Sequence, residues 1–174
     1  MSDEGRQGEP PLRALELLAA LTAHKVEFVV IGGFSLAAHG FVRGTKDVDI
    51  VPEPSRGNLQ RLLVALQDLE AEPHAIGDFK QEELPLQLDL AGLSQGGNWL
   101  LRTRLGRLDV MQHVPGMTSY AQLRAGAMSP VLAELDDAPP FAGYDDLIAM
   151  KHAAGRDQDL IDIAELERAR GTDS

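Results

Sequence analysis

The sequence contains no cysteine, few aromatic residues and no apolar run long enough to cross a membrane. Without cysteine the chain forms no disulfide bond and no thiolate metal site. The N-terminus lacks a charged region followed by an apolar core, so we expect no secretory signal peptide and a cytoplasmic protein without membrane contact. The length of 174 residues and a hydrophobic content of 44% fit a globular protein with an ordinary core.

Positive charge is scarce as well. Lysine and arginine total 16 against 27 acidic residues, which gives a formal net charge of −11. This balance counts against a broad nucleic-acid surface, because neutralising phosphates requires clustered basic side chains. One local patch is a candidate, namely Arg102, Arg104 and Arg107. Side chains that alternate along a half-exposed strand explain these three arginines at least as well.

Hydrophobic periodicity predicts a mixed α+β chain. Residues 1–11 are polar and contain glycine and proline, so we expect a disordered N-terminus before a single domain over residues 12–170, with a helical tail from about residue 144. The expected helices cover residues 12–24, 56–69 and 120–128, capped in two cases by Ser55 and Ser119. The expected strands cover residues 28–31, 47–51 and 84–90 and a segment that starts at Trp99 and ends within 106–111, with a loop over 72–80.

Residues 28–51 are the most informative stretch of the sequence. An apolar run ends at Gly32 and Gly33, which predicts a strand that leads through a tight turn into a short helix. Backbone N–H groups at such a helix start can bind phosphate, and the hydroxyl of Ser35 can add a further donor. An ordinary strand-to-helix turn is the alternative interpretation of two adjacent glycines.

Two aspartates close the same stretch. Asp47 and Asp49 flank Val48 in an expected strand, so both carboxylates point to one face. Like charges on one face are costly unless a cation joins them, and oxygen ligands suit Mg²⁺ or Mn²⁺. A solvated strand face is the alternative.

Together these residues resemble a known signature. Ile31-Gly32-Gly33, a spacer of thirteen residues and Asp47-Val48-Asp49-Ile50 are similar to the pattern of the DNA polymerase β-like nucleotidyltransferase superfamily. His39-Gly40 and Arg43-Gly44-Thr45 within the spacer resemble a branch of small bacterial nucleotidyltransferases found in abortive-infection and toxin–antitoxin systems. The resemblance implies a nucleotidyltransferase-fold mixed β-sheet with helices packed on one side and a short C-terminal helical tail.

The resemblance also implies a third acid on a neighbouring strand. Asp109 stands at the matching position, and Asp89 is the alternative because it also lies in an expected strand between apolar neighbours. A third carboxylate allows one site to hold two metal ions, one for the attacking hydroxyl and one for the leaving pyrophosphate.

The C-terminal region extends the resemblance. A helix that ends at Gly155 carries Lys151, and a second helix carries Asp159 and Asp162 on one face, with Leu160, Ile163 and Leu166 expected on the other. By resemblance, Lys151 reaches the triphosphate, Asp159 and Asp162 organise the site, and Arg43 belongs to the same nucleotide-binding set. The alternative is a surface network in which Lys151 and Arg156 pair with nearby acids.

The functional hypothesis is therefore a nucleotidyltransferase that transfers NMP from an NTP to an acceptor hydroxyl. The acceptor can be an RNA end such as that of tRNA, a protein side chain or a small molecule such as an aminoglycoside. The alternative hypothesis is a non-catalytic nucleotide-binding or antitoxin-like protein that retains the fold and acts through a cognate partner protein.

Overall fold

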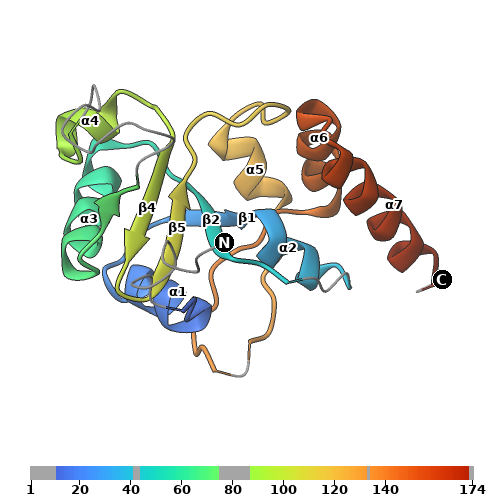
Figure 1. Ribbon diagram of the computed structural model, residues 1–174, viewed down its shortest axis with the longest axis horizontal. Helices are drawn as coiled ribbons and strands as arrows, with labels where there is room; N and C mark the ends of the chain where they lie inside the picture. Colours follow the sequence, from blue (N-terminus) through green and yellow to red (C-terminus); the bar gives the residue numbers. More distant parts are fainter. Residues whose placement is uncertain (1–10, 41–43, 75–86, 133, 173–174) are drawn as a thin grey trace, which may run out of the picture.

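The computed structural model describes residues 11–40, 44–74, 87–132 and 134–172. A five-stranded sheet with the order β1-β2-β5-β4-β3 forms its centre (Figure 1). The parallel pair is β2 with β5, and the other three pairs are antiparallel. The strands are β1 (Phe28–Ile31), β2 (Asp47–Pro52), β3 (Glu72–Pro73), β4 (Trp99–Thr103) and β5 (Gly106–Val110).

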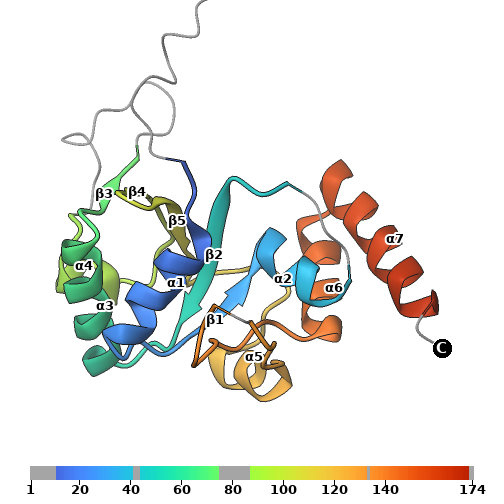
Figure 2. The ribbon, with the colours of Figure 1, turned by 90° about the horizontal axis from the view of Figure 1, so that it is seen from below.

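Two long helices cover one face of the sheet. They are α1 (Ala14–Ala23) and α3 (Arg56–Asp68), which lie on the same side of β2 in Figure 2. As predicted, Ser55 caps α3, and its hydroxyl accepts a hydrogen bond from the backbone N–H of Asn58. The leucines of both helices pack against the inward side chains of the strands, which forms the main hydrophobic core.

A second hydrophobic cluster includes Val29 and Ile31 of β1 and Val51 of β2. Val29 and Ile31 alternate with Val30 and Phe28, so β1 contributes to both clusters. The second cluster is completed by α2 (Gly32–Ala38), α5 (Tyr120–Gly126), α6 (Tyr144–Ala154) and α7 (Asp157–Thr172). Figure 2 shows α2, α6 and α7 on the side of β2 that faces away from α1 and α3. As expected, Ser119 caps α5, and Gly155 ends α6 in the left-handed conformation.

The segment that begins at Trp99 is a β-hairpin, and the prediction of one strand ending within 106–111 is wrong. Arg104 and Leu105 form the turn, and β5 returns antiparallel to β4. Thr103 stabilises this turn, because its hydroxyl donates to the carbonyl of Gly106 and accepts from the N–H of Leu105. Gly106 adopts a positive φ of 109°, a conformation that favours glycine.

Two predictions fail between β3 and β4. Glu72 and Pro73 lie in a short strand paired with β4 and not in a loop. The strand expected over 84–90 is wrong where the structure describes it, because Asp89 caps α4 (Leu90–Ser94) through its side chain. In this cap, the carboxylate of Asp89 accepts a hydrogen bond from the backbone N–H of Gly92 at 2.7 Å. Residues 75–86 lie outside the described part of the chain, as do residues 1–10 of the expected disordered N-terminus.

The two faces of α7 differ from the prediction. Asp159 and Asp162 are buried, with exposed fractions of 1% and 0%, and they share their face with Ile163 and Leu166. Leu160, which was expected on the opposite apolar face, is 53% exposed. The reason is a buried cation on α6, which is described below. No helix among the described residues is long and apolar enough to cross a membrane.

Candidate active site

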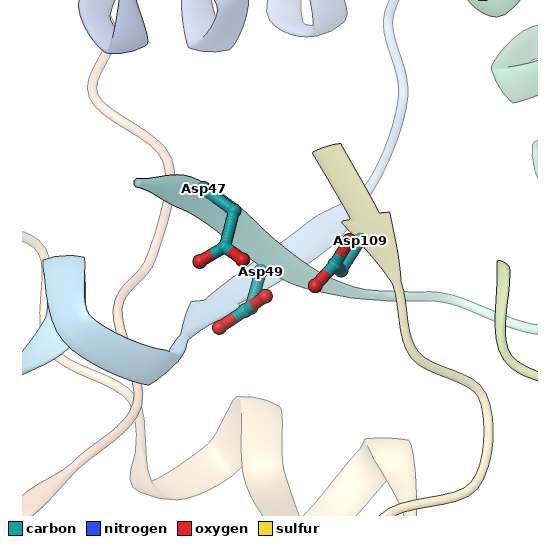
Figure 3. A group of neighbouring side chains, drawn as sticks. All are labelled: Asp47, Asp49 and Asp109. Carbon is teal, nitrogen blue, oxygen red and sulfur yellow. The ribbon is translucent and has the colours of Figure 1, made fainter. Parts of the chain in front are cut away.

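Three carboxylates converge on the open face of the central strands. The parallel register places Asp49 beside Asp109, and Asp47 lies two residues earlier on β2 and on the same face. One oxygen from each residue lies within 4.8 Å of the others (Figure 3). The resemblance-based choice of Asp109 therefore agrees with the geometry, whereas Asp89 is engaged as the α4 cap.

The three carboxylates perturb one another. Burial, followed by the charges of Asp47 and Asp109, raises the pKa of Asp49 to about 8. Burial also raises the pKa of Asp109 to about 6, and its hydrogen bond with Asp49 and the charge of Arg107 act in the opposite direction. The protein thus concentrates negative charge at a partly buried position, which suits a cation-binding site.

The glycine turn lies directly against these acids. Gly32 has a φ of 73°, and a Cβ atom at this residue would overlap the carboxylate of Asp49. Antiparallel pairing of Ile31 with Asp49 brings the start of α2 to this place. Only a residue without a side chain permits this approach.

Ser35 supports the turn from behind. Its side chain is fully buried, and its hydroxyl donates to the carbonyl oxygen of Gly32 at 2.7 Å. Gly32 and Gly33 line the cavity described next, whereas Ser35 is not among its lining residues. The structure therefore places Ser35 where it holds the backbone of the turn.

A cavity of about 670 Å³ extends from the acids toward α6 and α7. The sheet side of its wall carries Asp47, Asp49 and Asp109, and the helical side carries Lys151 and Asp159. The volume is in the range of ordinary small-molecule sites. Apolar side chains complete the lining, including Ile31, Leu100, Met111, Leu147 and Met150.

Lys151 lies opposite the carboxylates and forms a buried ionic cluster. Its ammonium group is 3.2 Å from Asp159 and 2.9 Å from Asp162, and both acids are buried. Its positive charge also acts on Asp49, whose pKa it lowers in part. This cluster is the reason why the acidic face of α7 is buried, because α6 presents a cation that requires counter-charges.

Arg156 joins the cluster from the exposed side. Its Nε atom donates to Asp159 at 2.7 Å, and this pairing holds the pKa of Asp159 below its usual value against the opposing effect of burial. The pairing of Lys151 and Arg156 with tail acids, considered as an alternative from the sequence, is thus present. It differs from a surface network because Lys151, Asp159 and Asp162 are buried.

Two further residues named from the sequence have simple placements. Arg43 lies outside the described residues, so its expected role stays a prediction. His39 contacts the carbonyl oxygen of Ala142 through Nε2 at 2.9 Å and lies edge-to-face with Tyr144. It therefore ties α2 to the segment before α6.

The sequence interpretation missed part of the cavity wall. Thr45 and Lys46 line the cavity directly before Asp47, and Arg156 lines it at the junction of α6 and α7. Lys46 had a usable signal, because a lysine adjacent to a paired-acid motif lies beside any anionic substrate bound there. Arg156 lies far from the acids in sequence, so its place in the wall required the fold.

Comparison with known proteins supports the fold. No family model matches the sequence, and no curated protein matches it in sequence. Two solved structures are similar to it, each with a TM-score of 0.52 over 91% of this chain. One is the solution structure of the antibiotic-resistance factor ANT(2'')-Ia, which is 16% identical in sequence and is covered over 80% of its length. The other is a crystal structure of ANT(2'')-Ia in complex with adenylyl-2''-tobramycin, which is 11% identical and is covered over 92% of its length. The chain has the nucleotidyltransferase fold. The α+β fold expected from the sequence resemblance is confirmed.

Proposed function

We propose that this protein is a divalent-metal-dependent nucleotidyltransferase that moves NMP from an NTP to an acceptor hydroxyl. One observation carries the proposal, namely the convergence of Asp47, Asp49 and Asp109 beside the Gly32 turn in one cavity. A structural neighbour with the same fold has been crystallised with adenylyl-2''-tobramycin, a molecule that contains a transferred adenylyl group. That likeness supports the reaction class for this chain.

The carboxylates fit a hard cation. They offer oxygen ligands from two adjacent strands, and burial together with the charges of Asp47 and Asp109 raises the pKa of Asp49 in the protein alone. We assign Asp47, Asp49 and Asp109 as the residues that hold Mg²⁺ or Mn²⁺. Bound there, the metal would offset the negative charge that develops around the transferred phosphorus and the leaving pyrophosphate.

The residues of the chain divide the remaining tasks. The backbone of Gly32 and Gly33 binds the triphosphate at the start of the turn, and Lys151 adds positive charge from the opposite wall. Arg43 is proposed to belong to the same set. Asp159 and Asp162 hold the ammonium group of Lys151 in place, and Ser35 holds the backbone of Gly32.

The chemical step of the proposed reaction is a substitution at the α-phosphorus of the NTP. The acceptor oxygen forms a bond to the α-phosphorus while the bond from that phosphorus to the bridging β-oxygen breaks, which releases pyrophosphate. The proton of the acceptor hydroxyl passes to a carboxylate oxygen of Asp109. This carboxylate lies beside Asp49 in the β2–β5 register and lines the cavity.

The experiment that tests this function follows the nucleotide itself. The protein is incubated with each α-³²P-labelled NTP and Mg²⁺ in cell extract, and label is traced into RNA, protein and small molecules. We expect transfer by the intact protein and none by D47A/D49A. The variant D136A/D137A, which removes two adjacent acids from an exposed loop, is the matched control and should retain transfer.

The acceptor class decides the biological setting. Label in RNA or protein would agree with the toxin–antitoxin or phage-defence context that the sequence resemblance suggests, and label in an added aminoglycoside would agree with a resistance role. Binding of NTP without transfer to any acceptor would contradict the proposed enzyme and favour the non-catalytic binding protein, acting with a partner.

A further inference from the structure

Arg156 connects α6 to α7 at the edge of the cavity. Gly155 ends α6 in the left-handed conformation, and α7 begins at Asp157, so Arg156 is the residue that joins the two helices. Its backbone N–H donates to the carboxylate of Asp159 at 3.1 Å, which fixes the backbone at this junction. Arg156 lines the cavity together with Lys151 and Asp159. The fold therefore presents a further cationic side chain to the space in which the triphosphate is proposed to bind.

The side chain of Arg156 is anchored by an acid and is still largely exposed. Its Nε and Nη2 atoms donate to the two carboxylate oxygens of Asp159 at 2.7 and 3.3 Å. Asp159 is buried, whereas 76% of the Arg156 side chain is exposed. A guanidinium group has five N–H donors, more than it uses on one carboxylate, so Arg156 can bind an anion in the cavity while it stays paired with Asp159. The pairing thus orients the guanidinium group for such an anion.

The ionic cluster on the helical wall is electrically balanced only when Arg156 is included. Lys151 alone lies between two buried acids, Asp159 and Asp162, at 3.2 and 2.9 Å. Arg156 supplies the second positive charge, so the formal charges of the four side chains cancel. A wall with excess negative charge would repel a triphosphate in a partly buried site. Arg156 therefore removes an electrostatic obstacle to nucleotide binding on this wall.

Lys151 and Arg156 lie at different depths of the cavity. The exposed fraction of the side chain is 11% for Lys151 and 76% for Arg156. Both act on the acids of the sheet. The charge of Lys151 opposes the effect of burial on the pKa of Asp49, and the pKa of Arg156 is raised chiefly by Asp159 and to a smaller extent by Asp49. When the α-phosphate lies at the metal-binding acids, the phosphate farthest from them reaches the outer edge of the wall, where Arg156 lies.

We propose that Arg156 binds the terminal phosphate of the nucleotide, so that the site selects nucleoside triphosphates over diphosphates and monophosphates. This inference rests on the proposed nucleotidyl transfer and adds a specificity-determining residue to it. Arginine suits this task because its planar group binds two phosphate oxygens with parallel N–H donors. The terminal phosphate leaves with the pyrophosphate, so Arg156 contacts the leaving group and not the nucleoside.

The test compares R156Q with R168Q. Arg168 pairs with Glu165 on α7 at the same spacing as Arg156 with Asp159 and has a similarly exposed side chain, but it does not line the cavity. In R156Q the carboxylate of Asp159 keeps Lys151 and the backbone N–H of residue 156, so we expect the variant to fold, which urea denaturation checks. Calorimetry with Mg²⁺ measures the affinity for the α,β-methylene analogues of ATP and ADP and for AMP.

We expect R156Q to bind the ATP analogue at least about tenfold more weakly than the wild type, which corresponds to the loss of one charge-assisted contact. Its affinity for the ADP analogue and for AMP should change by less than about threefold, because neither molecule carries the terminal phosphate. The salt dependence of ATP-analogue binding should also decrease. R168Q should bind all three nucleotides like the wild type.

Several results would overturn the inference. An equal loss for all three nucleotides in R156Q would indicate that Arg156 acts only by supporting Asp159, and a loss that grows evenly from AMP to the ATP analogue would indicate a general field without a contact. Equal binding of the ATP and ADP analogues by the wild type would overturn it and leave the proposed transferase intact. Failure of the wild type to bind any of the nucleotides would contradict both.

R156K is the second variant and keeps a positive charge beside Asp159. It replaces the paired N–H donors with a single ammonium group, so we expect a folded protein that binds the ATP analogue more weakly and the ADP analogue as the wild type does. This comparison tests the contact even if R156Q is unstable. Unchanged affinity of a folded R156K for both analogues would contradict paired binding of the terminal phosphate.

Discussion

Gly32 and Asp49 occupy adjoining space. The carboxylate of Asp49 lies where a side chain on residue 32 would begin, and Gly32 has a positive φ of 73°. The glycine turn and the pair of acids on β2, Asp47 and Asp49, are therefore one structural unit, because any side chain at residue 32 displaces the carboxylate of Asp49. The spacing of thirteen residues between Gly33 and Asp47 is the length of chain that connects the two halves of this unit.

Substitution of Gly32 tests this dependence. We expect G32A to lower the free energy of unfolding by about 1–3 kcal/mol, through strain at the positive φ and overlap with Asp49. Mg²⁺–ATP binding should be lost in parallel. Chemical denaturation and calorimetry measure the two effects.

The matched control is G97A. Gly97 lies in the loop before β4, and no atom lies within 4 Å of its Cβ position. This variant should keep both wild-type stability and nucleotide binding. A G32A protein that binds Mg²⁺–ATP as tightly as G97A would refute the coupling of turn and acid.

The raised pKa of Asp49 predicts a pH-dependent stability. In the unfolded chain this group titrates near 3.8, and in the folded protein near 8. Between these values the folded state binds more protons than the unfolded state, so the free energy of unfolding falls as pH rises. The stabilisation is complete below pH 4 and is lost as pH rises through about 8.

Thermal melts of D49N and wild type without metal measure this effect. By pH 8.5 the wild type should lose about 1–3 kcal/mol relative to D49N, or roughly 2–4 °C in Tm for each kcal/mol. Mg²⁺ at pH 8.5 should raise the Tm of the wild type and leave D49N unchanged. D136N, at an exposed loop position, should follow the wild type throughout. Parallel pH profiles for wild type and D49N would show that Asp49 is not perturbed.

The buried cluster around Lys151 predicts a large loss when the cation is removed. In K151M, Asp159 and Asp162 stay buried without the ammonium group, which should cost about 3–5 kcal/mol by urea denaturation. The triple variant K151M/D159N/D162N removes the buried charges together and should recover most of this stability.

The triple variant also separates structure from substrate binding. If Lys151 reaches the triphosphate, the triple variant should bind Mg²⁺–ATP at least about tenfold more weakly than the wild type. This factor corresponds to the loss of one charge-assisted contact. Unchanged affinity in this variant would assign Lys151 a purely structural role.

Ser35 is expected to act through the backbone of Gly32. S35A removes one buried hydrogen bond and should cost about 1 kcal/mol, with a loss of nucleotide affinity of less than about tenfold. S94A is the matched control, because Ser94 donates to the carbonyl of Leu90 on α4 in the same manner but lies away from the cavity. An affinity loss of about a hundredfold in S35A would instead indicate direct contact with phosphate.

The sequence was sufficient where chemistry is local. Alternation placed Asp47 and Asp49 on one face, and the two glycines predicted the strand-to-helix turn at which Gly32 lies. Asp109 was found through the family resemblance, since no local pattern distinguishes it from Asp89. The choice between them depends on the β2–β5 register, which is a long-range property.

The failures have the same origin. Leu160 was expected on the apolar face of α7, opposite the face that carries Asp159, because a helix normally buries its apolar residues. The buried ammonium group of Lys151 reverses that preference, and the contact between α6 and α7 is not visible in either helix alone. Likewise, the hairpin turn at Arg104 carries no Asn-Gly or Asp-Gly signal, so the division of one expected strand into β4 and β5 was missed.

The central claim is tested most directly by a crystal structure with Mn²⁺ and a non-hydrolysable NTP. We predict anomalous density for metal between Asp47, Asp49 and Asp109, with the triphosphate across the backbone of Gly32 and Gly33. The same crystals of D47N/D49N should show neither. A nucleotide bound elsewhere on the wild-type protein, with no metal among the three carboxylates, would contradict the account.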